Sequence, residues 1–115
     1  FVMDESVLHR RVGGNAVMRE QLAYLAKQAA RQDLAVNVLP FSAGLLPGMW
    51  ASTIVDSADT SEGDILCVPM VDPPMTITRD RYLLEQARID FARMVERAPQ
   101  GAELTWLLDE ARSRL

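Results

Sequence analysis

The strongest constraint on the fold is a strand–helix–strand pattern in the first forty or so residues. Phe1–Met3 is a short apolar run that predicts a strand. Apolar residues then recur at helical spacing over Met18–Ala29, with Asn15 as the expected N-cap and the helix end expected near Gln32–Asp33. The β-rich run Leu34–Leu39 follows. A strand, a helix and a strand in this order form a βαβ unit, so we expect two parallel strands joined by a right-handed crossover.

The second half of the chain predicts a hairpin followed by two helices. Two β-rich runs, Trp50–Val55 and Asp64–Val68, lie on either side of a polar loop, and Met75–Thr78 is a candidate edge strand. Helical spacing of apolar residues continues over Leu84–Met94 and over Leu104–Leu115. The whole pattern predicts an α/β chain of the α+β type: a βαβ unit, a hairpin and two C-terminal helices with one small mixed sheet.

The last predicted helix carries a continuous apolar face. Its members recur at helical spacing over about three turns: Leu104, Leu107, Leu108, Ala111 and Leu115. A short helix is marginal alone, so this face has to be buried. We expect it to pack on the core of its own chain, with packing on a second copy, to give a homodimer, as the alternative.

Length and charge restrict the class of protein. The 115 residues suit a single domain over residues 1–115, and the first residue lies within a predicted strand, so we expect an excised or incomplete domain. The 12 basic and 16 acidic residues give a net charge of −4, which makes the chain a poor binder of nucleic acid by itself. Neither a membrane span nor a secretory signal is recognisable, and the single cysteine fits a reducing compartment, so we expect a cytoplasmic protein.

Two acidic residues follow the first predicted strand. Asp4 and Glu5 lie where the carboxyl end of that strand is expected, and open α/β sheets bind ligands outside this edge. The alternative is structural: the two carboxylates accept loop amides or pair with Arg10 or Arg11. The residues alone leave both interpretations open.

No residue pattern indicates a catalytic or metal site. The chain has one histidine, His9, and one cysteine, Cys67, which lies in an apolar run where a free thiol typically serves as a small hydrophobic residue. The acidic loop between the hairpin strands lacks the spacing of a calcium loop. We therefore expect a protein that is not an enzyme and that uses no metal and no other cofactor.

Two further features have both a structural and a ligand-binding interpretation. The segment Arg10–Gly14 precedes a helix N-terminus, where anions bind, but glycines at that place are more typical of turn chemistry. The two tryptophans, Trp50 and Trp106, are expected to pack in the core or an interface, with the lining of a ligand pocket as the alternative.

Several short motifs in the first half share an order and spacing with a known family. They are Asp4-Glu5 with Leu8, Val12-Gly13, Gln21-Leu22, Val38-Leu39-Pro40 and Ala43-Gly44. Together they resemble the sensor-type C-terminal domain that follows the helix-turn-helix in actinobacterial Xre-type, antitoxin-like (WhiJ-like) transcriptional regulators. The resemblance is good over residues 1–48 and looser from Trp50 onward, where Pro69 stands about where such domains have an acidic residue.

The resemblance implies a regulator whose DNA contacts lie in a helix-turn-helix absent from this chain. This domain would receive a signal, either an unknown small molecule or a partner protein, and it would have no catalytic residues. The candidate ligand site lies at the carboxyl ends of the two parallel strands, with these side chains: Asp4, Glu5, Arg11, Gln21, Phe41 and Ser42. A dimerisation or antitoxin-type module without a small-molecule ligand is the alternative. A small hydrolase or nuclease is the third hypothesis, and no His-x-Lys pair supports it.

Overall fold

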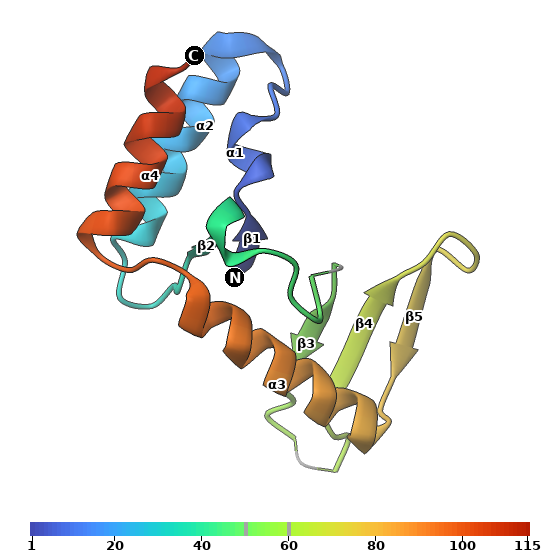
Figure 1. Cartoon of the computed structure of the whole chain (residues 1–115). Coiled ribbons are helices and arrows are strands. Elements are labelled where there is room, and N and C mark those ends of the chain that lie inside the picture. The colour runs from blue at the N-terminus through green and yellow to red at the C-terminus, as the bar shows by residue number, and fades with distance from the viewer. Residues whose placement is uncertain (50, 60) are drawn as a thin grey trace. The chain divides into compact units, whose positions relative to one another are not determined.

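The computed structural model describes residues 1–49, 51–59 and 61–115. Trp50, the first residue of the expected hairpin, lies outside the described residues. The chain forms two compact units: Phe1–Gly44 with Met94–Leu115, and Leu45–Arg93. Each unit has its own sheet (Figure 1).

The first unit is built on the predicted βαβ unit. β1 (Val2–Asp4) and β2 (Asn37–Leu39) are parallel, and α2 (Gly14–Ala29) lies between them in the chain. All three residues of β2 are buried, including the polar Asn37, whose side-chain amide donates to the carbonyl oxygen of Phe1 at 3.0 Å. The unit also contains three further elements: α1 (Ser6–His9), the 3-10 turn η1 (Phe41–Ala43) and α4 (Ala102–Ser113).

α2 begins and ends differently from the prediction. It begins at Gly14, and Gly13 before it has a left-handed φ of 76°, which glycine adopts without strain. Capping by Asn15 is wrong: its side-chain amide donates to the carbonyl oxygen of Leu115 at 2.8 Å and ties the helix start to the end of the chain. The helix already ends at Ala29, because the following amides close a tighter turn.

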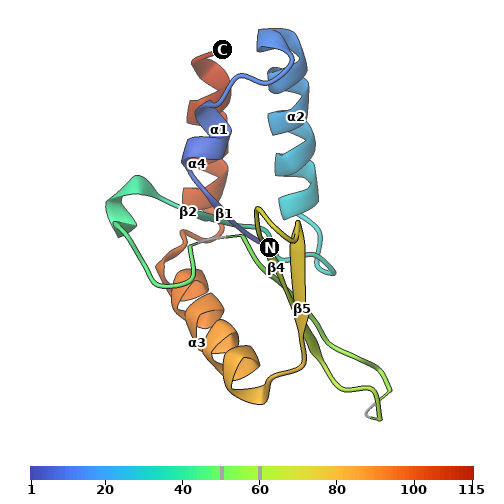
Figure 2. The ribbon, with the colours of Figure 1, turned by 90° about the vertical axis from the view of Figure 1, so that its right-hand side faces the viewer.

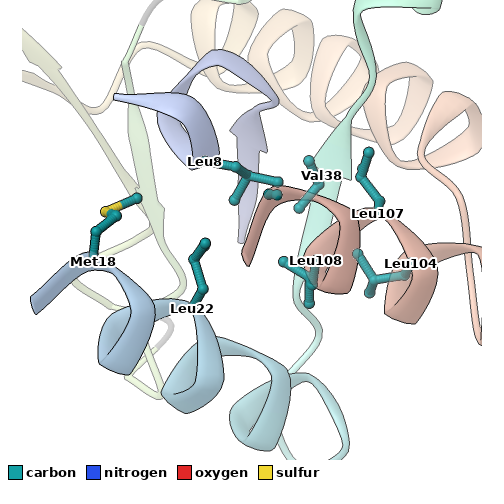
Figure 3. Packing of buried hydrophobic residues seen from close by; sticks show 8 residues of the cluster. Leu8, Met18, Leu22, Val38, Leu104, Leu107 and Leu108 are labelled. Carbon is teal, nitrogen blue, oxygen red and sulfur yellow. The ribbon is translucent and has the colours of Figure 1, made fainter. Parts of the chain in front are cut away.

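The core of the first unit lies between α2 and α4. Its buried side chains come from α1, α2, β2 and α4: Leu8, Met18, Leu22, Val38, Leu104, Leu107, Leu108 and Ala111. Figure 3 shows side chains of this cluster turned toward one another between the helices. The prediction that the last helix packs on the core of its own chain is therefore confirmed.

The second unit contains an antiparallel sheet in the order β3–β4–β5. β3 (Thr53–Val55) and β4 (Ile65–Pro69) form the predicted hairpin, and β5 (Met75–Thr78) is the predicted edge strand, so the α+β class is confirmed. The prediction of one mixed sheet is wrong: within the described residues the parallel and antiparallel strands form two separate sheets. The hairpin strands pair with each other and with β5, while β1 and β2 pair only with each other in the described part of the chain.

α3 (Arg81–Arg97) follows β5. Its start is capped by Asp80, whose carboxylate accepts the amide of Leu83 at 2.9 Å. Further along α3, the Arg88 guanidinium donates to the carboxylates of Asp56 and Asp64, which lie at the two ends of the hairpin loop. Hydrogen bonding to Asp56 is the main cause that raises the pKa of Arg88. Arg88 thus ties the helix to the hairpin.

Candidate functional site

The carboxyl ends of β1 and β2 meet at one edge of the parallel pair. Asp4, the last residue of β1, lies opposite Leu39, the last residue of β2. The next amide along, that of Glu5, donates to the carbonyl oxygen of Leu39 at 3.0 Å. The segments that follow the two strands are therefore held side by side, as the topology predicts.

Glu5 is the centre of this edge. Its side chain is only 14% exposed, and its Oε2 accepts the backbone amide of Phe41 at 2.7 Å. Its Oε1 lies 3.4 Å from Nε2 of His9, one helical turn further along the chain. The His9 ring stacks on the Phe41 ring, with centroids 5.9 Å apart and an interplanar angle of 22°. We name Glu5, His9 and Phe41 the edge cluster.

The contacts of Asp4 and Glu5 support the structural interpretation of the acidic pair, and a place for the two residues in a ligand site stays a prediction. Asp4 Oδ1 accepts the amide of Ser6 at 2.9 Å and so holds the start of α1. Together with the bond from Phe41 to Glu5, this confirms that both carboxylates accept loop amides. In the described part of the chain neither carboxylate pairs with Arg10 or Arg11. Both acidic residues therefore shape the edge.

A small hollow lies beside the edge cluster. It has a volume of about 180 Å³ and is lined by residues that follow β2 and by residues of α4 and the segment before it: Pro40, Ser42, Pro99, Glu103, Trp106 and Leu107. We name it the edge hollow. Two aromatic rings border this region and remain largely exposed, Phe41 at 59% and Trp106 at 63%. Packing of Trp106 in the core is therefore wrong, and its packing in an interface, the other part of that expectation, stays a prediction.

The structure brings together four of the six predicted site residues. Asp4, Glu5, Phe41 and Ser42 all lie at the carboxyl edge. Arg11 and Gln21 are exposed, and within residues 1–49, 51–59 and 61–115 neither side chain forms a hydrogen bond or an ion pair. Their placement in a ligand site thus stays a prediction.

Three residues at the edge were missing from the predicted site: His9, Glu103 and Trp106. His9 lies four residues after Glu5, a spacing that brings side chains together on one turn of helix, so local spacing was a usable signal. Glu103 and Trp106 come from the last helix, far away in the sequence. Only the fold brings them to the strands.

A second hollow lies in the other unit. It measures about 340 Å³ and is lined by an equal number of acidic and basic side chains, with Gly63 and Leu84: Glu62, Asp64, Glu85, Arg79, Arg81 and Arg88. Arg88 is already engaged by Asp56 and Asp64. The acidic and basic side chains of the lining balance in number, so this hollow has no excess charge with which to select a ligand.

The described residues contain neither a candidate metal site nor a candidate membrane-spanning helix. No group of three or more His, Cys, Asp or Glu side chains there lies close enough to hold a metal ion. In the same residues, no helix combines the length and the apolar character that crossing a membrane needs. Cys67 is a half-buried free thiol on β4.

Fold and site together define a small α+β domain with an aromatic edge at the ends of a parallel strand pair. The chain belongs to a family described as a domain of unknown function (DUF5753), whose model matches residues 1–110. Comparison with curated proteins and with solved structures found no match.

Proposed function

We propose that the chain is the regulatory domain, signal-sensing or protein-interacting, of a helix-turn-helix transcriptional regulator. The support is the resemblance of residues 1–48 to the domain behind the helix-turn-helix in Xre-type, WhiJ-like regulators, together with the family match over residues 1–110. In this proposal the domain binds and does not catalyse. DNA is bound by a part of the regulator outside this chain, because a net charge of −4 opposes phosphate.

The observation that carries the proposal is the aromatic surface at the carboxyl edge. Phe41 and Trp106 are more than half exposed, and His9 and Pro40 lie beside them. Exposing large rings to water is unfavourable, and aromatic side chains are enriched where proteins bind partners. Glu5 fixes the position of Phe41 through the backbone, so the surface is preformed. This arrangement favours a binding role.

The size of the edge hollow favours a protein partner over a small molecule. Small-molecule sites usually measure about 300–1,000 Å³, whereas the edge hollow measures about 180 Å³. A space of that size suits one or two side chains of another protein. The Glu103 carboxylate lines it and forms no ion pair within the described residues, so a basic side chain is the best complement.

The alternative, dimerisation through the apolar face of the last helix, has little support, because that face is not exposed. The leucines of that helix are buried in the core of their own chain, so they are not available to a second copy. A dimer would therefore need a surface other than these buried leucines.

The proposal is tested on the intact regulator in its own host. Trp106→Ala removes an exposed ring from the edge, and Tyr24→Ala removes a similarly exposed ring, 58% exposed, from α2 as the matched control. We expect Trp106→Ala to keep the same genomic binding sites by chromatin immunoprecipitation but to change the transcript levels of the genes it controls. Tyr24→Ala should behave as wild type. Unchanged transcript levels with Trp106→Ala would contradict a receiving role for this edge.

A further inference from the structure

β5 is an exposed edge strand that has little of the usual protection beyond its short length of four residues. It lies at the end of the strand order β3–β4–β5, and Figure 2 shows it beside β4. Its sequence, Met75-Thr76-Ile77-Thr78, contains no charge and no proline. Met75 is 51% and Ile77 is 58% exposed. Proteins usually protect exposed edges with lysine, proline or a bulge, because a bare edge pairs with other strands.

The register shows which backbone groups of β5 are free to pair. The amide of Met70 donates to the carbonyl oxygen of Pro74 at 3.2 Å, just outside the β4–β5 ladder. Hydrogen-bonded pairs alternate along an antiparallel ladder, so Thr76 and Thr78 direct their backbone groups to β4. Met75 and Ile77 therefore direct their amides and carbonyls away from the sheet. Their side chains also share one face of it.

We propose that β5 pairs antiparallel with β5 of a second copy of this chain, around a two-fold axis at Thr76. In this register Met75 lies opposite Ile77 of the second copy, and the two residues exchange both of their backbone hydrogen bonds. Every outward amide and carbonyl of Met75 and Ile77 is then satisfied, on both copies. The two three-stranded sheets become one continuous sheet.

In this register the side chains of β5 are complementary to those of β5 in the second copy. Met75 contacts Ile77 of the second copy on one face, and Thr76 lies opposite its own counterpart on the other face. Apolar cross-strand pairs and Thr–Thr pairs are both favourable. The chain carries a net charge of −4, so two copies repel each other on average, and an uncharged strand is where that repulsion is least. Self-complementarity thus selects a second copy as the occupant.

The apolar character of one sheet face continues across the proposed junction. The register places these side chains on the same face as Met75 and Ile77: Val55, Ile65 and Cys67. An antiparallel sheet with one face to solvent usually carries polar residues there. A paired strand of four residues is short, however, and stable interfaces bury about 800 Å² on each partner. We therefore expect a weak dimer that depends on concentration.

The experiment is analytical ultracentrifugation of the 115-residue chain from about 5 µM to about 1 mM, a range that covers weak association. Wild type should shift from monomer to dimer over this range. Ile77→Lys places a charge beside the axis and should weaken dimerisation at least about tenfold. Val55→Lys is the matched control, because Val55 lies on the other edge strand, on the same face, and is 46% exposed. It should dimerise as wild type.

A second variant guards against an effect of the lysine itself. Ile77→Pro removes an outward amide and leaves the bonds from Thr76 and Thr78 to β4 intact, so the sheet should persist by circular dichroism while the dimer is lost. A wild-type chain that stays monomeric at about 1 mM would overturn the proposal. So would equal dimerisation of wild type, Ile77→Lys and Ile77→Pro.

A cross-link tests the register directly. Residues opposite each other at a non-hydrogen-bonded position have Cα atoms about 4.5 Å apart, close enough for a disulfide. Thr76→Cys in a Cys67→Ser background should therefore form a covalent dimer on mild oxidation, whereas Thr53→Cys in the same background should not. Equal cross-linking of both variants would show random collision and contradict the two-fold axis at Thr76.

Discussion

Removing the Glu5 carboxylate measures how much the carboxyl edge depends on one charged hydrogen bond. Glu5 is 14% exposed and accepts the amide of Phe41 at 2.7 Å. Hydrogen bonds to charged groups contribute about 1.5–3 kcal/mol, and neutral ones about 0.5–1.5 kcal/mol. Glu5→Gln keeps a neutral acceptor in the same place, so we expect it to lower the free energy of unfolding by about 1 kcal/mol. Glu5→Ala loses the acceptor, and we expect about 1.5–3 kcal/mol.

Urea unfolding followed by circular dichroism gives these free energies. With a denaturant slope of about 2 kcal/mol/M, a loss of 1 kcal/mol lowers the midpoint by about 0.5 M. Arg11→Gln is the control, since Arg11 is exposed and forms no hydrogen bond among the described side chains; its effect should stay within about 0.5 kcal/mol. If Glu5→Ala destabilises no more than Arg11→Gln, Glu5 does not hold the edge and the argument for a preformed surface fails.

Three further predictions follow from the core, an exposed carboxylate and the net charge. Leu108 is 2% exposed in the core, so Leu108→Ala should cost about 2–5 kcal/mol of unfolding free energy in the same urea assay, and a cost below 1 kcal/mol would contradict the packing of α4. Hydrogen bonding by Ser61 lowers the pKa of Asp59, so the Asp59 carboxylate stabilises the fold above its unfolded pKa, and this stabilisation is lost as the pH falls through the folded pKa. The free energy of unfolding of Asp59→Asn should therefore fall less than that of wild type between about pH 5 and pH 3. An equal fall in both proteins would refute this. With a net charge of −4, this chain alone should give no site-specific complex with duplex DNA in a low-salt gel shift.

The elements that local periodicity specifies were predictable from the sequence. The βαβ unit follows from an apolar run, a helical stripe and a β-rich run, and the parallel register of Met3 with Val38 agrees with it. The apolar face of α4 was predictable for the same reason, because leucines at spacings of three and four residues must be buried on one side. The amide-accepting role of Asp4 and Glu5 was one of two interpretations that their position allowed.

The rest depends on contacts between residues far apart in the chain. Asn15 has the chemistry of a cap, but its amide instead reaches the carbonyl of Leu115. From the sequence, Trp106 could pack in the core or line a pocket. Its side chain is 63% exposed because α4 turns its leucines, and not this residue, toward the core. The separation into two sheets likewise depends on strand pairing, which local propensity does not encode. Local sequence patterns do not predict such contacts between residues far apart in the chain.

Native mass spectrometry shows whether the carboxyl edge of β1 and β2 binds a partner. The intact regulator is purified from its own host as wild type, Trp106→Ala and Tyr24→Ala. We expect a species of protein mass bound to wild type and to Tyr24→Ala, and absent from Trp106→Ala. A bound mass of a few hundred daltons, lost in the same variant, would replace the protein partner with a small molecule at the same edge. Equal occupancy in all three proteins, including none, would contradict the claim.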